Sequence, residues 1–104
     1  MITLRGSSSS TLIYTSQAFD HSPYNNNAGF NYTINHNFGV EPNLLNCQVL
    51  DANGFWMQHD DYVFTGGNSY GWEQVSGGLN TAVVGMYRFT SGQGTWVRFI
   101  LYKI

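Results

Sequence analysis

The sequence predicts a single all-β domain, an antiparallel β-sandwich of about six to eight strands. Strand-like runs recur at intervals of about 8 to 12 residues with glycine-bearing turns between them, which is typical of a sandwich or a small barrel. Aromatic residues make up 16% of the 104 residues and charged residues only 10%, so the chain lacks the charged side chains that cover long helices. A chain of this length suits one core.

We expect a short arm, residues 1–10, followed by the sandwich domain, residues 11–104. The arm starts with a strand-like run and continues with Gly6 and four serines, a composition that is typical of a flexible connector. The predicted strands are residues 11–19, 30–34, 44–50, 55–58, 62–65, 70–75, 82–89 and 95–104.

The segments between these strands carry residues that favour turns. Asn53 and Gly54 suit the tight turn of a hairpin, and a further turn is predicted at residues 90–94. The loop at residues 20–29 contains Pro23 and three consecutive asparagines, which tolerate left-handed backbone. Because about ten residues is long for a loop in a compact domain, this loop is a candidate binding loop.

The last predicted strand has two apolar faces. Alternation places Val97, Phe99 and Leu101 on one face, which we expect to enter the core. The opposite face is too apolar to meet only water, and its residues are Trp96, Arg98, Ile100 and Tyr102. Neighbouring loops or another subunit must cover it. The enrichment of large aromatics and arginine in protein interfaces favours a subunit, so we predict an oligomer interface there.

The charge and the hydropathy pattern argue against two classes of partner. The net charge is -2 and the four basic residues are scattered, so we predict no nucleic-acid binding. The apolar stretches are far shorter than the roughly 20 residues that span a bilayer, so we predict no membrane insertion. The single cysteine, Cys47, lies in a strand-like run, where we expect it to be buried as a small hydrophobic residue.

The residues that could perform catalysis or hold a metal form no established pattern. Asp60 and Asp61 are adjacent, so on an extended chain they point to opposite faces and cannot act together as general acid and base. His59 has the residue type for a metal site, but no spacing fixes a set of ligands. We therefore predict no enzyme activity, no cofactor and no metal. A site assembled from residues far apart in the sequence stays open as an alternative.

The middle of the chain carries residues that suit sugar recognition, which requires an aromatic ring face and side chains that bond hydroxyl groups. We predict as ligand-binding residues Trp56, His59, Asp60, Asp61, Asn68, Tyr70 and Trp72, and Tyr24 and Glu73 belong to the same aromatic and polar set. Tyr70 and Trp72 lie two residues apart and so share one face of a strand. The alternative is that the aromatic members are core or edge residues of short strands.

The order of three segments carries a family resemblance. The turn His-Asn-Phe-Gly-Val-Glu-Pro-Asn at residues 36–43 leads into a strand, an Asp-Ala-Asn-Gly turn follows at residues 51–54, and Trp-Val-Arg-Phe at residues 96–99 begins the closing strand. Over about residues 30–104 this layout resembles receptor-binding domains at the tips of bacteriophage tail fibres, and it is similar to the H-type lectin fold. The resemblance implies a jelly-roll or H-type-lectin-like sandwich, a homotrimer and a place on the virion, and it assigns no site residue by position.

These observations lead to one expectation about function and one alternative. We expect a receptor-binding, carbohydrate-binding module of a phage tail fibre or similar virion appendage, which recognises host-surface glycans. The alternative is a structural virion protein, such as a fibre head, adaptor or capsid decoration, whose exposed aromatic residues contact other subunits and which binds no ligand.

Overall fold

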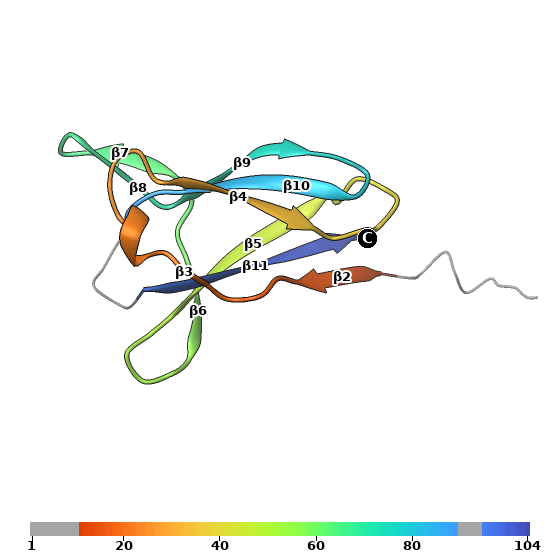
Figure 1. The fold of residues 1–104 in the computed structure, drawn as a ribbon, viewed down its shortest axis with the longest axis horizontal. Coiled ribbons are helices and arrows are strands. Elements are labelled where there is room, and N and C mark those ends of the chain that lie inside the picture. Colours follow the sequence, from red (N-terminus) through yellow and green to blue (C-terminus); the bar gives the residue numbers. More distant parts are fainter. Residues whose placement is uncertain (1–10, 90–94) are drawn as a thin grey trace, which may run out of the picture.

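The computed structural model describes residues 11–89 and 95–104 (Figure 1). The predicted arm at residues 1–10 and the predicted turn at residues 90–94 lie outside these described ranges. The described part is all-β and contains no α-helix, which confirms the predicted fold class. Its helical structure is limited to the 3-10 turn η2 (Ser22–Tyr24), and no helix within it has the length and apolar character needed to cross a membrane.

Two sheets face each other, and a separate hairpin lies at one end of the molecule (Figure 1). One sheet has the strand order β4-β10-β9, and the other has the order β2-β11-β5-β6, with β3 paired to one end of β11. Strands β7 and β8 form the hairpin. The bounds are β2 Leu12–Thr15, β3 Phe19–Asp20, β4 Phe30–Asn35, β5 Leu44–Leu50, β6 Trp56–Gln58, β7 Val63–Thr65, β8 Asn68–Tyr70, β9 Trp72–Gly77, β10 Thr81–Met86 and β11 Trp96–Lys103.

The described residues form ten strands, more than the six to eight predicted, because two predicted strands are interrupted. One of these interruptions is at Gly71, which separates β8 from β9. Gly71 has a φ of 86°, and a Cβ atom at this position would collide with the main-chain oxygens of Asp60 and Asp61. Glycine is therefore required here, and the chain changes direction between two short strands.

The other interruption is a β-bulge between β2 and β3. Residues 16–18 face only two residues of β11, so one residue is left over. The amide of Ser16 donates a hydrogen bond to the carbonyl oxygen of Phe99 (2.8 Å), and the amide of Phe99 donates to the Ser16 hydroxyl (2.9 Å). The serine side chain thus replaces a main-chain acceptor, which allows pairing with β11 to resume after the bulge.

The core lies between the two sheets, and alternation along the strands determines which residues reach it. Val97, Phe99 and Leu101 of β11 are fully buried, as their spacing predicted. Cys47 of β5 is also fully buried, and burial raises the pKa of its thiol. The facing sheet contributes the buried residues Tyr32, Ile34, Ala82, Val84 and Met86. Strands β4, β5 and β11 therefore follow the period of two that one buried face requires.

We predict that Phe99→Ala lowers the free energy of unfolding by about 3–5 kcal/mol, because it leaves a cavity between the sheets. It also removes ring contacts with Phe19 and Tyr32, at centroid distances of 6.2 and 5.6 Å. The control is Phe55→Ala, since Phe55 is 67% exposed and should contribute less than about 0.5 kcal/mol. Urea unfolding followed by tryptophan fluorescence measures both variants, and equal losses would contradict the placement of the core.

Candidate functional site

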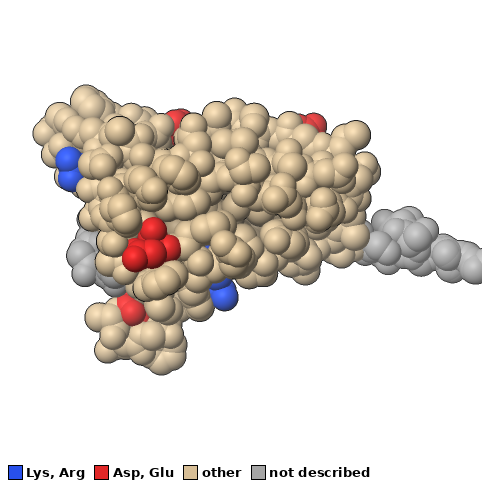
Figure 2. Space-filling model, in the orientation of Figure 1, with Lys and Arg blue, Asp and Glu red and all other residues tan. Residues whose placement is uncertain are grey.

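The side of the β2-β11-β5-β6 sheet that faces away from the core forms a continuous surface, here called the outer face. Residues directly opposite each other on paired strands point to the same side, so the strand register defines this surface. Its members are Ile13, Thr15, Asp20, Leu44, Asn46, Gln48, Leu50, Trp56, Gln58, Trp96, Arg98, Ile100 and Tyr102. Charged atoms are few and scattered on the side of the molecule that Figure 2 shows. The outer face shares this character, and its charged members are Asp20 and Arg98.

One end of the outer face, the aromatic end, consists of Gln48, Trp56, Trp96 and Arg98. The guanidinium carbon of Arg98 lies 4.3 Å from the centre of the Trp56 ring, and the Arg98 Nε donates a 2.8 Å hydrogen bond to Gln48 Oε1. Trp96 lies two residues before Arg98 on the same strand face and is 42% exposed. The ring and the amide fix the arginine from two sides, so it is oriented before any partner binds.

The chemistry of the aromatic end suits a ligand with both apolar and hydroxyl groups. A guanidinium carries five N–H donors, and the bond to Gln48 uses one of them. The exposed indole of Trp96 offers an apolar ring beside these donors. A sugar ring presents C–H groups on one side and hydroxyl groups at its edge, which is the combination that such a surface can bind.

The other end, the aliphatic end, consists of Ile13, Leu44, Ile100 and Tyr102. Ile13 is 60% exposed and Leu44 is 52% exposed, whereas Ile100 and Tyr102 are half-buried between them. Tyr102 pairs with both Ile13 and Leu44 across the strands, so the four side chains adjoin. The predicted interface residues of β11 therefore lie on one exposed face, divided between its two ends. Contact of this face with another subunit stays a prediction.

The predicted ligand-binding residues are spread over four places, one of which is the interior. Trp56 is at the aromatic end, and Asn68 and Tyr70 are half-buried on β8. Asp60 and Asp61 are exposed in the connection between β6 and β7. Gln48 is not among the predicted residues, because only the register between β5 and β11 places it against Arg98.

Trp72 and His59 are part of the interior. Trp72 is 9% exposed, and its indole N–H donates a 3.2 Å hydrogen bond to the carbonyl oxygen of His59. The alternative that the aromatic residues belong to the core therefore applies to Trp72, whose ring offers little surface for stacking. Within the described ranges, no three His, Cys, Asp or Glu side chains lie close enough to hold a metal ion.

Two asparagines of the candidate binding loop, Asn25 and Asn27, hold the loop to the rest of the domain, and Asn26 closes a turn within it. Asn25 Oδ1 accepts a hydrogen bond from the amide of Phe89 (3.1 Å), and Asn26 Oδ1 accepts one from the amide of Gly29 (2.9 Å). Asn27 Oδ1 accepts from the amide of Ser69 (2.9 Å), which ties the loop to the β7-β8 hairpin. These amide oxygens therefore serve the fold, and the loop's length follows from the partners it must reach.

Two buried histidines flank one phenylalanine. His21 is fully buried: its Nε2–H donates to the carbonyl oxygen of Tyr87 and its Nδ1 accepts from the Tyr32 hydroxyl, both at 2.7 Å. His59 is nearly as buried, and its Nε2 has no hydrogen-bond partner among the described residues. The rings of His21 and His59 lie 5.6 and 5.9 Å from that of Phe89. Burial lowers the pKa of both imidazoles, so the fold favours their neutral forms.

Comparison of the chain with known protein families, with curated proteins and with solved structures gave no match. The geometry of the site and the motifs of the sequence are thus the basis for proposing a function.

We predict that the protein loses stability as the pH falls below about 6.5, the ordinary pKa of histidine. The folded-state pKa values of His21 and His59 are lowered, so the unfolded chain binds more protons than the folded chain over this range. Each additional proton lowers the free energy of unfolding by up to about 1.4 kcal/mol for each pH unit of decrease. The charged or polar groups that act on these rings include the Tyr32 hydroxyl, the Tyr87 carbonyl and Asp20 at His21, and the Arg88 carbonyl and Asp60 at His59.

Urea unfolding at a series of pH values between about 7.5 and 5 tests this dependence. His59→Leu should reduce the slope, because it removes one titrating group whose Nε2 has no partner among the described residues. A free energy of unfolding that stays constant over this range would contradict the prediction.

Proposed function

We propose that the protein is a receptor-binding module of a virion appendage, such as a phage tail fibre, and that it binds host-surface glycan through the aromatic end. The observation that carries this proposal is the Arg98 guanidinium held between the Trp56 ring and Gln48, with the exposed Trp96 beside it. The sequence motifs that resemble phage receptor-binding domains support the same class of function.

The aromatic end is suited to recognition rather than to catalysis. The Arg98 guanidinium offers hydrogen-bond donors, and Gln48 and the two tryptophans are not acids or bases. Such side chains bind a ligand by stacking and by hydrogen bonds, which is how a sugar is recognised without being changed. The low charge of the surrounding face is compatible with a neutral glycan.

Trp56→Ala should weaken glycan binding by about tenfold or more, because it removes a ring of the site and the support for Arg98. The matched control is Phe55→Ala, which removes a 67% exposed aromatic side chain from the position just before β6, outside the residues that define the outer face. A glycan array followed by calorimetry on the sugars that bind gives the affinities. If both variants bind as the unsubstituted protein does, the site assignment is wrong.

A second candidate function has its own support at the aliphatic end. Ile13 and Leu44 are large apolar side chains that are more than half exposed and adjoin Tyr102. We propose that this end packs against other copies of the chain, in agreement with the homotrimer that the resemblance implies. If the aromatic end binds no glycan, this contact alone would make the protein a structural component of the virion.

Leu44→Lys should shift the protein toward the monomer, because a charge placed at a buried contact must be desolvated. The control is Leu79→Lys, since Leu79 is 61% exposed in the turn between β9 and β10, outside the outer face. Multi-angle light scattering over a range of concentrations measures the mass of each. An unsubstituted protein that stays monomeric at all concentrations would exclude the contact.

A further inference from the structure

Strand β4 is the edge of its sheet and lacks the features that normally protect an edge. An edge strand presents main-chain N–H and C=O groups that can pair with another chain, and proteins usually block such edges with charge, proline, bulges or short strands. Strand β4 has six residues, Phe-Asn-Tyr-Thr-Ile-Asn, with no charged residue and no proline, and its register with β10 is regular throughout.

The other three sheet edges each show one of these protective features. Strand β2 has four residues and ends at the bulge of Ser16, and β6 has three residues. Strand β9 is as long as β4, but it contains Glu73, and its register with β10 shifts at Val83 and Val84. Among the edges of the two sheets that the structure describes, β4 is thus the one best suited to accept a strand.

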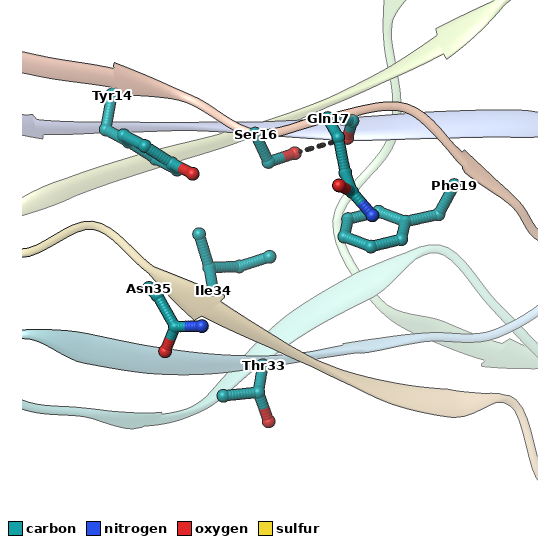
Figure 3. Close-up of a pocket in the computed structure, with 7 residues that line it drawn as sticks. All are labelled: Tyr14, Ser16, Gln17, Phe19, Thr33, Ile34 and Asn35. Atoms are coloured by element: carbon teal, nitrogen blue, oxygen red, sulfur yellow. Dashed lines mark hydrogen bonds between the residues drawn. The ribbon is translucent and has the colours of Figure 1, made fainter.

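A hollow of about 160 Å³ opens beside this edge, between β4 and the β2-β3 segment (Figure 3). Ile34 and the Gln17 side chain point into it, with Tyr14 at one end and the Phe19 ring at the other. The side chains of Thr33 and Asn35 project away from it, so β4 borders the hollow with its main chain (Figure 3). The bulge at Ser16 displaces Gln17 from the strand register, which helps to form the opening.

The size and lining of the hollow indicate what would fill it. A cavity of roughly 150 Å³ lined by apolar side chains holds one benzene molecule, so this hollow has room for one leucine or phenylalanine side chain. No charged side chain lines it. The rings of Tyr14 and Phe19 with Ile34, which is 1% exposed, supply apolar contacts, and Ser16, Gln17, Thr33 and Asn35 supply polar ones. A second copy that paired its own β4 here would direct Tyr32 and Ile34 into its own core and would leave the hollow unfilled.

We propose that the β4 edge and this hollow form a docking groove for an extended, uncharged peptide segment of a partner protein. The peptide adds a strand to the β4-β10-β9 sheet through main-chain hydrogen bonds, and one large apolar side chain of the peptide enters the hollow. Main-chain pairing supplies affinity that is independent of sequence, and the hollow supplies selectivity. This groove is distinct from the outer face and does not depend on glycan binding.

Fluorescently labelled heptapeptides of threonine with leucine, phenylalanine, glycine or glutamate at the centre test the proposal against the full chain. The leucine and phenylalanine peptides should bind at least about tenfold more tightly than the glycine and glutamate peptides, because only they fill the hollow. Bound peptide should shift the NMR amide signals of residues 16–17 and 33–35. Equal binding of the leucine and glycine peptides, or binding of neither, would overturn the proposal.

Two substitutions at exposed glutamines distinguish the groove from non-specific binding. Gln17→Trp should fill the hollow and weaken binding of the leucine peptide by about tenfold or more, whereas Gln74→Trp on the β9 edge should leave it unchanged. Circular dichroism checks that both variants fold. If the peptides fail to bind and Thr33→Pro instead lowers the mass of an assembly of this chain, the edge pairs two copies and the peptide proposal is wrong.

Discussion

Strand β11 is the constraint on which the rest of the structure depends. It pairs with β2 and β3 on one side and with β5 on the other, and its inner residues fill the centre of the core. Because side chains alternate along a strand, burying Val97, Phe99 and Leu101 forces Trp96, Arg98, Ile100 and Tyr102 onto the outer face. A slip of one residue would exchange the two sets, so the register of β11 fixes both the core and the surface.

The bulge at Ser16 shows how this register is maintained when the neighbouring strand carries an extra residue. The Ser16 hydroxyl accepts the hydrogen bond of the Phe99 amide, so the main-chain donor of a fully buried residue keeps a partner. The bulge also directs Gln17 toward the space beside β4. One local irregularity therefore stabilises the β11 pairing and leaves a hollow at the opposite sheet edge.

The sequence predicted what depends on local pattern. Alternation identified the buried and exposed sides of β11, and turn residues marked the hairpin between β5 and β6. Predictions that depend on distant neighbours were less complete. The strand break at Gly71 follows from close contact with Asp60 and Asp61, which no local pattern reveals. The period of two alone could not show that Trp72 belongs to the core, since its burial depends on what packs against β9.

The candidate site illustrates the same limit. Trp56 was predicted as a ligand-binding residue and Arg98 as an interface residue, but their contact requires the register of three strands, β11, β5 and β6. Gln48 had no signal of its own, because a glutamine in a strand-like run has many possible neighbours. The roles of Asn25 and Asn27 likewise depend on partners that lie about 40 to 60 residues away in the chain.

The low charge of the chain determines how a surface of this kind can recognise a partner. With a net charge of -2 there is little long-range attraction, so association depends on stacking, hydrogen bonds and apolar contact at short range. A shallow site of two tryptophans, one arginine and one amide buries little area, which keeps the affinity of a single site low. In the assembly that we propose, several copies held together would compensate, because after one site binds, the others meet the same surface at high effective concentration. Arg98 and Tyr102 lie on the same face of β11, so this strand would link glycan contact to assembly.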